Sequence, residues 1–383
     1  MAQSFQYKLR YNNRYYWLRQ ISFREKQSFN DFIRLSDTGS VFQSYEWGEL
    51  KRIYGWQPIR LLLEARNSIV GAATILKRTT AGIPFFYSPR GPALDYNKPH
   101  LLSLFCRGVD PLARREKAAF WRLDPELPGT FEQNTILSDS RLKPVPSASP
   151  FGGTQPRWVW RIPLAGSPED QWLSLKKGAR RQVNKARAAG ITVQDGTKKD
   201  IPAFYNLLSE TAKRNNFLLR SPKYYIDLWN MLSFSSCLRM LLAFQDRTPV
   251  ATALAVGFGR GVWDIYAGNS HLNRNNGASY LLTWELISWA SSQGYNFYDL
   301  GGIAPQVGQD HPLAGLKMFK SRFGGGEVEF IGEHDLVFHP LSYRVWQWGH
   351  KTFQLINWFR KAVVEKPIDA RHTAGGRPAI KNE

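Results

Sequence analysis

The sequence predicts an α/β protein of the α+β type, with two domains that each contain a mixed sheet flanked by helices. Its 383 residues are long for a single hydrophobic core and suit two domains of ordinary size. Between residues 238 and 300, strand-like patterns repeat, and a helix pattern precedes the last of them. Residues 138–155 are rich in Ser, Pro and Gly, so we expect the chain to cross between the two domains there.

The first domain is expected to begin with polar, basic residues and helices and to continue as a sheet. Ser44 is a candidate N-cap for a helix that carries Trp47 and Leu50 on its apolar face. A turn at 65–68 joins two β-rich runs into a hairpin. Other helices are predicted over 26–35 and 99–108, and the predicted strands are 58–64, 69–77, 83–87 and 118–123.

The second domain is expected to contain most of the remaining elements. Its predicted strands are 157–162, 238–245, 249–257, 261–268 and 295–300, and its predicted helices are 167–187, 200–215 and 278–293. A strand over 327–337 is expected to return to the first domain. The predicted boundaries are therefore 1–155 for the first domain, completed by 327–365, and 156–326 for the second, with a disordered tail over 366–383.

The order of elements in the second domain resembles the core of GNAT acyltransferases. Residues 274–278 approximate the Arg-x-x-Gly-x-Gly/Ala loop that wraps a pyrophosphate at a helix N-terminus in that family. The last small position of the loop holds Ser279. Both a working coenzyme A site and a relic of common ancestry fit this partial match, and we favour the relic.

The composition favours an anionic partner. Lys and Arg number 51 against 31 Asp and Glu, a net charge of +20 that suits nucleic acid, a phospholipid surface or phosphorylated substrates. The two cysteines, Cys106 and Cys237, lack metal-type spacing, which favours a cytosolic protein with free thiols. The sequence has neither the apolar core of a signal peptide at its start nor a run of roughly 20 apolar residues, so any membrane contact is expected to be peripheral.

A glycine-punctuated stretch at 298–325 is the strongest candidate for a site. Glycine pairs stand near both of its ends, as is typical where backbone takes positive φ or passes close to a ligand. Between them, Lys317 and Lys320 lie three residues apart beside Phe319, a spacing that can aim one cation into a cleft. On spacing alone, a hairpin-like connection with solvated lysines is the stronger interpretation.

The same stretch resembles the signature of the Fem family, the FemA-, FemB- and FemX-type aminoacyltransferases that build peptidoglycan bridges. The matching residues are Tyr298-Asp299-Leu300-Gly301-Gly302, Gly315-Leu316, Phe319-Lys320, Phe323-Gly324-Gly325, Gly332-Glu333 and Asp335. Further matches upstream extend the resemblance over roughly Val41 to Tyr343. The chain lacks the long heptad insertion of FemA and FemB, so it is closer to the FemX-like arrangement.

The resemblance implies two tandem GNAT-like domains and a reaction. An amino acid would move from aminoacyl-tRNA to an amine of a peptidoglycan precursor that is linked to a nucleotide or a lipid. No separate cofactor is implied, because aminoacyl-tRNA is itself the co-substrate. Both substrates are polyanions, which agrees with the basic composition.

The resemblance also implies substrate-binding residues. A lysine at the position of Lys51 helps to bind the substrate's phosphates in the family, whereas alone it would be one more exposed lysine. Arg220 and Tyr224 match an arginine and a tyrosine that line the substrate site, against the alternative of a surface arginine and a half-buried tyrosine. The rigid turn at 89–92 presents Arg90 or Asp95 at a strand end. Two interpretations of this segment are equally favoured, a stiff turn with a structural role and a functional loop.

Acyl transfer to an amine requires stabilisation of a tetrahedral oxyanion by a fixed cation or by N–H donors. Lys320, together with the backbone of Phe319, is the candidate stabiliser. Tyr224 and Tyr266 are candidates for hydrogen-bonding the substrates or relaying a proton, and Lys317 is a candidate substrate contact. The sequence contains no nucleophile elbow, paired-histidine motif or phosphate loop, and its seven histidines are scattered, so we expect no metal site.

A basic helix is the candidate contact for tRNA or another polyanion. A charge run is usually a solvated face, but the absence of any acid between Leu175 and Gln194 favours a polyanion contact. The basic residues of this helix are Lys176, Lys177, Arg180, Arg181 and Lys185.

Two other functions remain open. One is a coenzyme A-dependent N-acyltransferase of the GNAT type. The other is a non-catalytic protein that binds nucleic acid or an anionic membrane, for which the aromatic and basic helix pattern at 343–364 is a candidate interfacial segment. The expected location is the cytoplasm, with the inner face of the membrane as an alternative, and the sequence does not indicate an oligomeric state.

Overall fold

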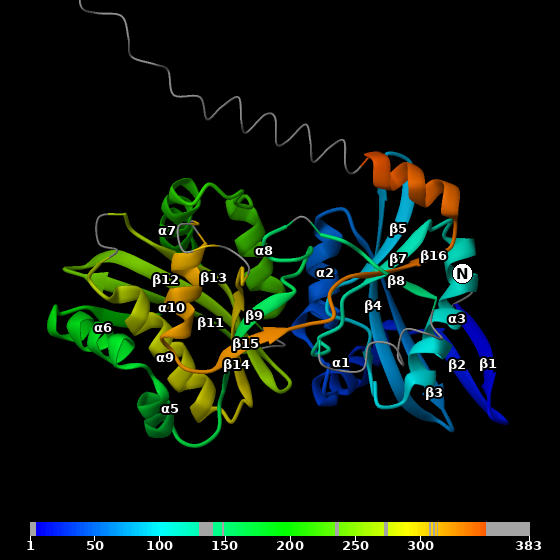
Figure 1. The fold of residues 1–383 in the computed structure, drawn as a ribbon, viewed down its shortest axis with the longest axis horizontal. Helices are drawn as coiled ribbons and strands as arrows, with labels where there is room; N and C mark the ends of the chain where they lie inside the picture. The colour runs from blue at the N-terminus through cyan, green and yellow to red at the C-terminus, as the bar shows by residue number, and fades with distance from the viewer. Residues whose placement is uncertain are drawn as a thin grey trace, which may run out of the picture.

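The computed structural model describes residues 5–129, 141–147, 149–233, 237–271, 275–305, 308, 311 and 313–349. These residues form two domains that lie side by side, each built around one sheet (Figure 1). Each sheet contains both antiparallel and parallel neighbours and is flanked by helices. The predicted fold class of mixed sheets flanked by helices is therefore confirmed. The predicted tail at 366–383 and the end of the last helix pattern lie outside the described residues.

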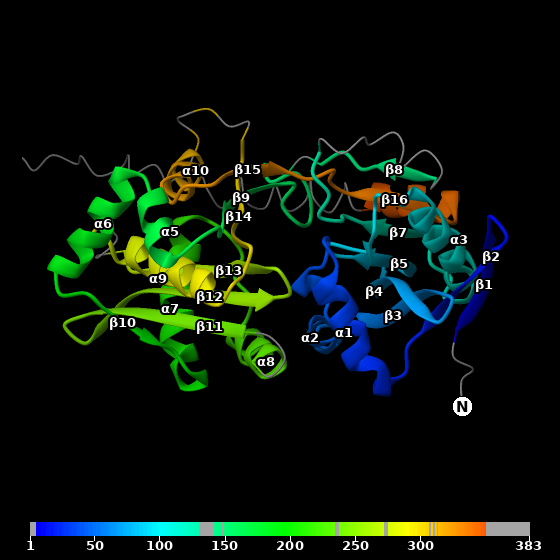
Figure 2. The same ribbon diagram turned by 90° about the horizontal axis from the view of Figure 1, so that it is seen from below.

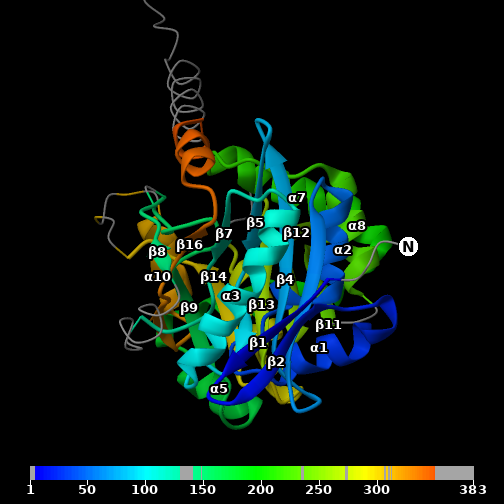
Figure 3. The same ribbon diagram turned by 90° about the vertical axis from the view of Figure 1, so that its right-hand side faces the viewer.

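In the first domain, nine described strands form a sheet in the order β1-β2-β3-β4-β5-β7-β16-β8, with β6 paired to β4. The strands are β1 (Gln6–Tyr11), β2 (Arg14–Gln20), β3 (Gln57–Ala65), β4 (Ser68–Thr80), β5 (Ile83–Ser88), β6 (Ala93–Leu94), β7 (Phe120–Leu123), β8 (Leu142–Pro144) and β16 (His334–Val337). The helices are α1 (Lys26–Leu35), α2 (Tyr45–Ile53), α3 (Pro99–Arg115) and a final helix over 340–349. Figure 3 views this domain from the side away from the second one, with α3 in front of the sheet.

In the second domain, seven described strands form a sheet in the order β10-β11-β12-β13-β14-β9-β15. The strands are β9 (Trp158–Pro163), β10 (Thr192–Asp195), β11 (Cys237–Gln245), β12 (Thr248–Phe258), β13 (Gly261–Asn269), β14 (Phe297–Gly302) and β15 (Gly326–Glu329). The helices are α5 (Pro168–Ser174), α6 (Lys177–Ala188), α7 (Ile201–Arg214), α8 (Pro222–Leu232), α9 (Ala278–Ser292) and α10 (Ala314–Ser321).

The two domains repeat one arrangement of strands. In each, three antiparallel strands lead to a parallel neighbour: β3, β4 and β5 lead to β7, and β11, β12 and β13 lead to β14. A helix joins each parallel pair, α3 in the first domain and α9 in the second. A parallel pair requires such a crossover connection, because a tight hairpin can only reverse the chain. The second domain therefore repeats the architecture of the first.

Three apolar clusters hold the layers together. One lies between the first sheet and α3, and another lies between the second sheet and α5, α6 and α9. The third crosses the domain boundary, where Phe29 and Leu50 of the first domain share a cluster with Leu208 and Leu228 of the second. Helices α2 and α8 lie next to each other at this boundary (Figure 2). A large apolar interface favours a fixed placement of one domain against the other.

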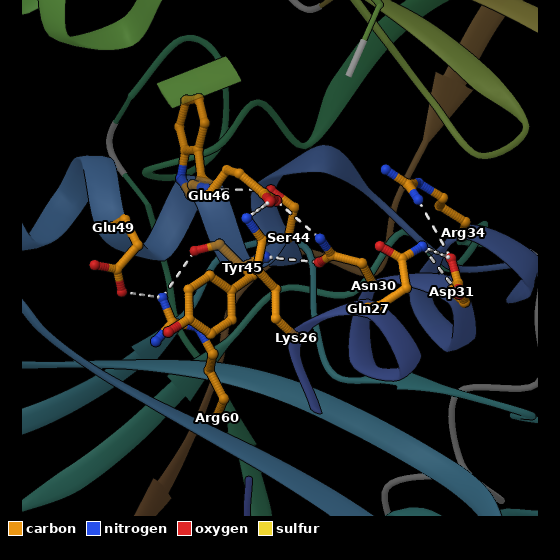
Figure 4. Close-up of polar contacts among 11 residues, drawn as sticks. Lys26, Gln27, Asn30, Asp31, Arg34, Ser44, Tyr45, Glu46, Glu49 and Arg60 are labelled. Atoms are coloured by element: carbon orange, nitrogen blue, oxygen red, sulfur yellow. Dashed lines mark hydrogen bonds and ion pairs between the residues drawn. The ribbon is translucent and has the colours of Figure 1, made fainter. Parts of the chain in front are cut away.

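A polar network sets the orientation of α2 (Figure 4). Ser44 caps the helix by accepting the backbone N–H of Trp47 at 3.1 Å. The Glu46 carboxylate accepts from Asn30 of α1 at 2.9 Å and pairs with Lys26 at 2.8 Å. On the next turn, Glu49 pairs with Arg60 of β3 at 2.7 Å. These contacts leave the opposite side of α2 to face α8.

Several predicted elements were wrong in their extent. Residues 6–20 were not assigned strands, yet they form the hairpin β1–β2, in which Asn12 and Asn13 take positive φ. The single helix expected over 167–187 is two helices, because Leu175 and Lys176 are extended. The irregular segment expected at 138–155 includes β8.

The strand expected over 327–337 is also divided. β15 pairs with β9 in the second sheet, whereas β16 pairs with β7 and β8 in the first. Gly332 lies between them with φ of 82°, a conformation that a glycine adopts without strain. The return to the first sheet therefore begins at His334 rather than at Glu327.

Candidate active site

A small cavity opens where β13 and β14 separate. The two strands pair only over Gly261–Trp263 and Phe297–Asp299. Just beyond this pairing, β13 carries a bulge at Ile265, since Ala255 faces Asp264 while Leu254 faces Tyr266. The cavity has a volume of about 330 Å³ and is lined by β13 and by α7, α9 and α10. Bulges often re-aim side chains next to active sites, and this volume suits a small substrate group.

Lys320 on α10 places its ammonium group in this cavity. The residue is only 8% exposed, and its Nζ donates to the Gly302 carbonyl at 2.7 Å. Burial lowers the pKa of Lys320 to about 8, while the negative charges of Asp264 and Asp299 act to raise it. The side chain therefore remains largely a cation at neutral pH, although little water surrounds it.

The turn at Gly301 and Gly302 holds this lysine through Asp299. One oxygen of the Asp299 carboxylate accepts the Gly301 N–H at 2.7 Å, and the other accepts from Arg161 at 2.8 Å. Gly301 has a φ of 78°, which glycine adopts readily. Asp299 thus fixes the turn at Gly301, and the carbonyl of the next residue, Gly302, orients Lys320.

Of the other residues predicted around Lys320, two line the cavity and one lies outside it. Phe319 and Tyr266 line the same cavity as Lys320. Phe319 is the sixth residue of α10, and at that position the backbone N–H bonds the carbonyl four residues earlier, so its backbone is not available as an oxyanion donor. Lys317 is not among the lining residues and pairs with Glu327 at 2.8 Å.

The predicted substrate-binding residues Lys51, Arg220 and Tyr224 meet at the contact between α2 and α8. The Lys51 ammonium donates to the Tyr224 hydroxyl at 3.3 Å and lies 4.5 Å from the centre of the Trp47 ring. The Arg220 guanidinium lies 5.7 Å from the centre of the Tyr224 ring. Residues that are far apart in the sequence are therefore brought into one cluster across the domain boundary.

This cluster adjoins the cavity through two tyrosines. Burial raises the pKa of Tyr266 well above its ordinary value, and the neighbouring Tyr224 raises it further. Tyr266 lines the cavity that holds Lys320, whereas Tyr224 contacts Lys51. Tyr266 therefore links the two predicted groups of site residues, because it lines the cavity and also interacts with Tyr224.

The basic helix α6 packs against α9. Ala179, Val183 and Ala186 are buried on one side, while Lys177 and Arg181 are exposed one helical turn apart on the other. Of the remaining predicted contacts, Lys176 and Lys185 are exposed and Arg180 is half-buried. The Lys185 ammonium donates to the Asn275 carbonyl at 2.9 Å, just before α9, whose first turns line the cavity.

Comparison with known proteins decides the family. The model of the FemAB family matches residues 25–138, 149–248 and 233–351, which is most of the chain. The chain belongs to the FemAB family. The similarity to the Fem signature is therefore confirmed, and four of the signature residues, Leu300, Leu316, Phe319 and Lys320, line the cavity.

Named relatives of this FemAB protein are transferases. A UDP-N-acetylmuramoylpentapeptide-lysine N(6)-alanyltransferase of Weissella viridescens is 27% identical over 83% of this chain and 95% of its own length. A lipid II:glycine glycyltransferase of Staphylococcus aureus is 24% identical over 83% of this chain and 93% of its own length. The crystal structure of FemX superimposes with a TM-score of 0.78 at 18% identity, over 85% of this chain and 99% of that one. That likeness confirms the predicted tandem fold.

Two predicted substrate contacts lie elsewhere in this FemAB protein. Arg90 is buried, donates to the Pro156 carbonyl at 2.7 Å and pairs with Glu126 at 3.6 Å. Asp95 pairs with Lys98 at 2.7 Å at the edge of a different cavity. That cavity is larger, about 1500 Å³, but neither Lys320 nor Lys51 lines it. The structure therefore does not bring Arg90 or Asp95 to the site, because Arg90 is held by Pro156 and Glu126 and Asp95 by Lys98.

The loop that resembles a coenzyme A site is covered by α6. Gly277 has a φ of 86°, and a Cβ atom built there would lie 2.4 Å from the Gln182 carbonyl of α6. The backbone at Gly277 therefore packs closely against α6. Arg274, the first residue of that loop motif, lies outside the described residues.

One acid of the site, Asp264, was not predicted from the sequence. Its side chain lines the cavity beside Lys320 and Tyr266, and burial raises its pKa to about 7. A signal was present, because Asp264 interrupts an otherwise apolar strand pattern two residues before Tyr266.

Over the described ranges, no helix is long and apolar enough to cross a membrane, and no group of three or more metal-ligating side chains gathers.

Proposed function

We propose that this FemAB protein is an aminoacyltransferase that moves an amino acid from aminoacyl-tRNA to an amine of a peptidoglycan precursor. The relatives support the reaction class, since their names describe alanyl and glycyl transfer to a nucleotide-linked pentapeptide or to lipid II. The observation that carries the proposal is the buried Lys320 cation, fixed by the Gly302 carbonyl inside a cavity of about 330 Å³.

The chemistry follows from that cation. When an amine attacks an ester carbonyl, negative charge develops on the carbonyl oxygen, and a fixed donor with little surrounding water stabilises it strongly. Lys320 is such a donor, because its stem is buried and its head is held at 2.7 Å by Gly302. The reaction needs no covalent intermediate on the enzyme, so the cavity requires no nucleophilic side chain.

The donor substrate is assigned to the α9 side of the cavity, since the basic helix α6 packs against α9. The exposed Lys177 and Arg181 form a cationic stripe that can bind the phosphates of an RNA acceptor arm. Lys185 ties that helix to the segment before α9, so the stripe and the cavity keep a fixed relation. A coenzyme A donor is not proposed, because the names of the relatives describe alanyl and glycyl transfer.

The acceptor is assigned to the cluster at α2 and α8. Lys51 and Arg220 place two cations around Tyr224, an arrangement that suits a diphosphate. A precursor held there by its phosphates could extend past Tyr266 toward Lys320. Its action on a cytoplasmic precursor, with peripheral contact to the membrane when that precursor is a lipid, belongs to the same proposal.

The test is a transfer assay with defined substrates. The protein is incubated with tRNA that is charged with labelled alanine or glycine, together with one acceptor. The acceptor is a UDP-linked muramyl pentapeptide in one reaction and lipid II in another. We expect the mass of one acceptor to increase by one amino acid residue while the aminoacyl ester is consumed. Consumption of acetyl-CoA without turnover of aminoacyl-tRNA would contradict the proposal, and binding of RNA without any product would favour a non-catalytic protein.

A further inference from the structure

We infer that Asp264 is a second catalytic residue of this site, which takes the proton from the acceptor amine as that amine attacks the ester. The inference rests on the proposed function and adds the base that the reaction needs. It starts from the position of Asp264 at the point where β13 leaves β14.

The geometry places Asp264 and Lys320 around one point. Trp263 is the last residue of β13 that pairs with β14, so Asp264 is the first residue at the mouth of the gap. A Cβ atom built on Gly301 would lie 3.6 Å from the Asp264 carbonyl oxygen and 3.8 Å from the Lys320 ammonium. Both side chains line the same cavity. A reacting ester that reaches Lys320 therefore passes beside Asp264.

Within the described part of the chain, the Asp264 carboxylate has fewer hydrogen-bond partners than the nearby Asp299. The nearby Asp299 has both oxygens occupied, one by Arg161 and one by the Gly301 N–H. The polar side chain next to Asp264 is instead the hydroxyl of the buried Tyr298. An acid on an apolar strand with so few partners is costly unless it serves a purpose at the cavity. Of the two acids, Asp264 is the one that can act on a substrate.

Asp264 carries one proton from the attacking amine to the leaving group. The amine lone pair forms the new N–C bond, and the carbonyl π electrons move to the oxygen beside Lys320. The nitrogen, now positively charged, gives one proton to the Asp264 carboxylate. Collapse of the intermediate restores the carbonyl and breaks the ester C–O bond, and the departing ribose oxygen takes a proton back from Asp264. The products are an amide and the free hydroxyl of the tRNA, and Asp264 is again a carboxylate.

The electrostatics fit this role. Burial raises the pKa of Asp264 to about 7, the Lys320 cation lowers it, and the Asp299 charge raises it. A base is most effective when its pKa lies near the working pH. The charged or titratable groups that face it are Lys320 from α10, and Asp299 and Tyr298 from β14.

The first measurement is the rate of transfer by Asp264→Asn, which keeps the shape of the side chain and removes its basicity. We expect kcat with a lysine-containing muramyl pentapeptide to fall by about 10²-fold or more. Circular dichroism and thermal unfolding of the same variant report whether it is folded.

The second measurement is the pH dependence of kcat, with Asp299→Asn as the matched control. In the wild-type protein, we expect the rate to rise as Asp264 loses its proton near pH 7 and to fall as Lys320 loses its proton near pH 8. Asp264→Asn should lose the acidic limb. Asp299→Asn should keep that limb at a lower pH, because the Asp299 charge raises the pKa of Asp264.

The outcomes separate the two hypotheses. If a folded Asp264→Asn variant retains the wild-type rate or the acidic limb, Asp264 is not the base and the inference is overturned while the proposed function stands. If the wild-type protein consumes no aminoacyl ester with any acceptor, the proposed function itself fails, and the inference fails with it.

Discussion

At the scale of single residues, Lys320 is the side chain on which the proposed chemistry depends most. Lys320→Met keeps the apolar stem but removes the cation, so we expect kcat to fall by about 10²- to 10³-fold, the range for loss of one oxyanion donor. Folding should change little, because burial already disfavours the charged form of this lysine. Single-turnover transfer rates and thermal unfolding together test this expectation.

The matched control is Lys317→Met, one turn earlier on the same helix. Lys317 pairs with Glu327 outside the cavity, and such a partly exposed ion pair contributes only about 0–1 kcal/mol to stability. We expect near-normal transfer by this variant. Full activity of Lys320→Met, or a loss explained by unfolding alone, would remove Lys320 from its role. A greater sensitivity at Lys317 would move the role to that residue.

At the scale of elements, local patterns predicted some of the site and long-range pairing decided the rest. The capped helix at Ser44 and the glycine-rich turn were predictable, because caps and glycines act over a few residues. The role of Asp299 was not predictable, since it depends on Arg161, which is 138 residues away in the sequence. For Arg90 the sequence left a stiff turn and a functional loop open, since its burial against Pro156 is a tertiary contact.

The α6 element makes a separate prediction about the donor. Lys177→Gln combined with Arg181→Gln should weaken tRNA binding and reduce the slope of log affinity against log salt by about 1 for each phosphate that is no longer neutralised. The control is Lys198→Gln with Lys199→Gln, two exposed lysines of the same domain that lie on a different turn. Binding is measured by filter retention across a salt series. Equal effects of both pairs would indicate a general attraction to net charge instead of a site on α6.

At the scale of the whole molecule, the repeated domains and their shared core place the site. Two domains and a returning chain were predictable from the sequence, but an apolar cluster that runs across the boundary was not. Such a cluster is assembled from helices α1, α2, α7 and α8, and periodicity alone does not say which apolar faces meet. Since α2 and α8 belong to different domains, the Lys51 cluster exists only when the two domains are packed together.

The last prediction separates binding from packing at that boundary. Lys51→Ala removes a proposed phosphate ligand, so we expect the KM for the acceptor to rise by about tenfold or more while kcat changes little, as for loss of uniform binding. Tyr54→Phe is the control, because it removes the 2.8 Å hydrogen bond from Tyr54 to Asp227 of α8 and leaves the Lys51 ammonium in place. Initial rates over a range of acceptor concentrations measure both. If Tyr54→Phe raises KM as much as Lys51→Ala does, the cluster acts by holding the domains together, and Lys51 is not a phosphate ligand.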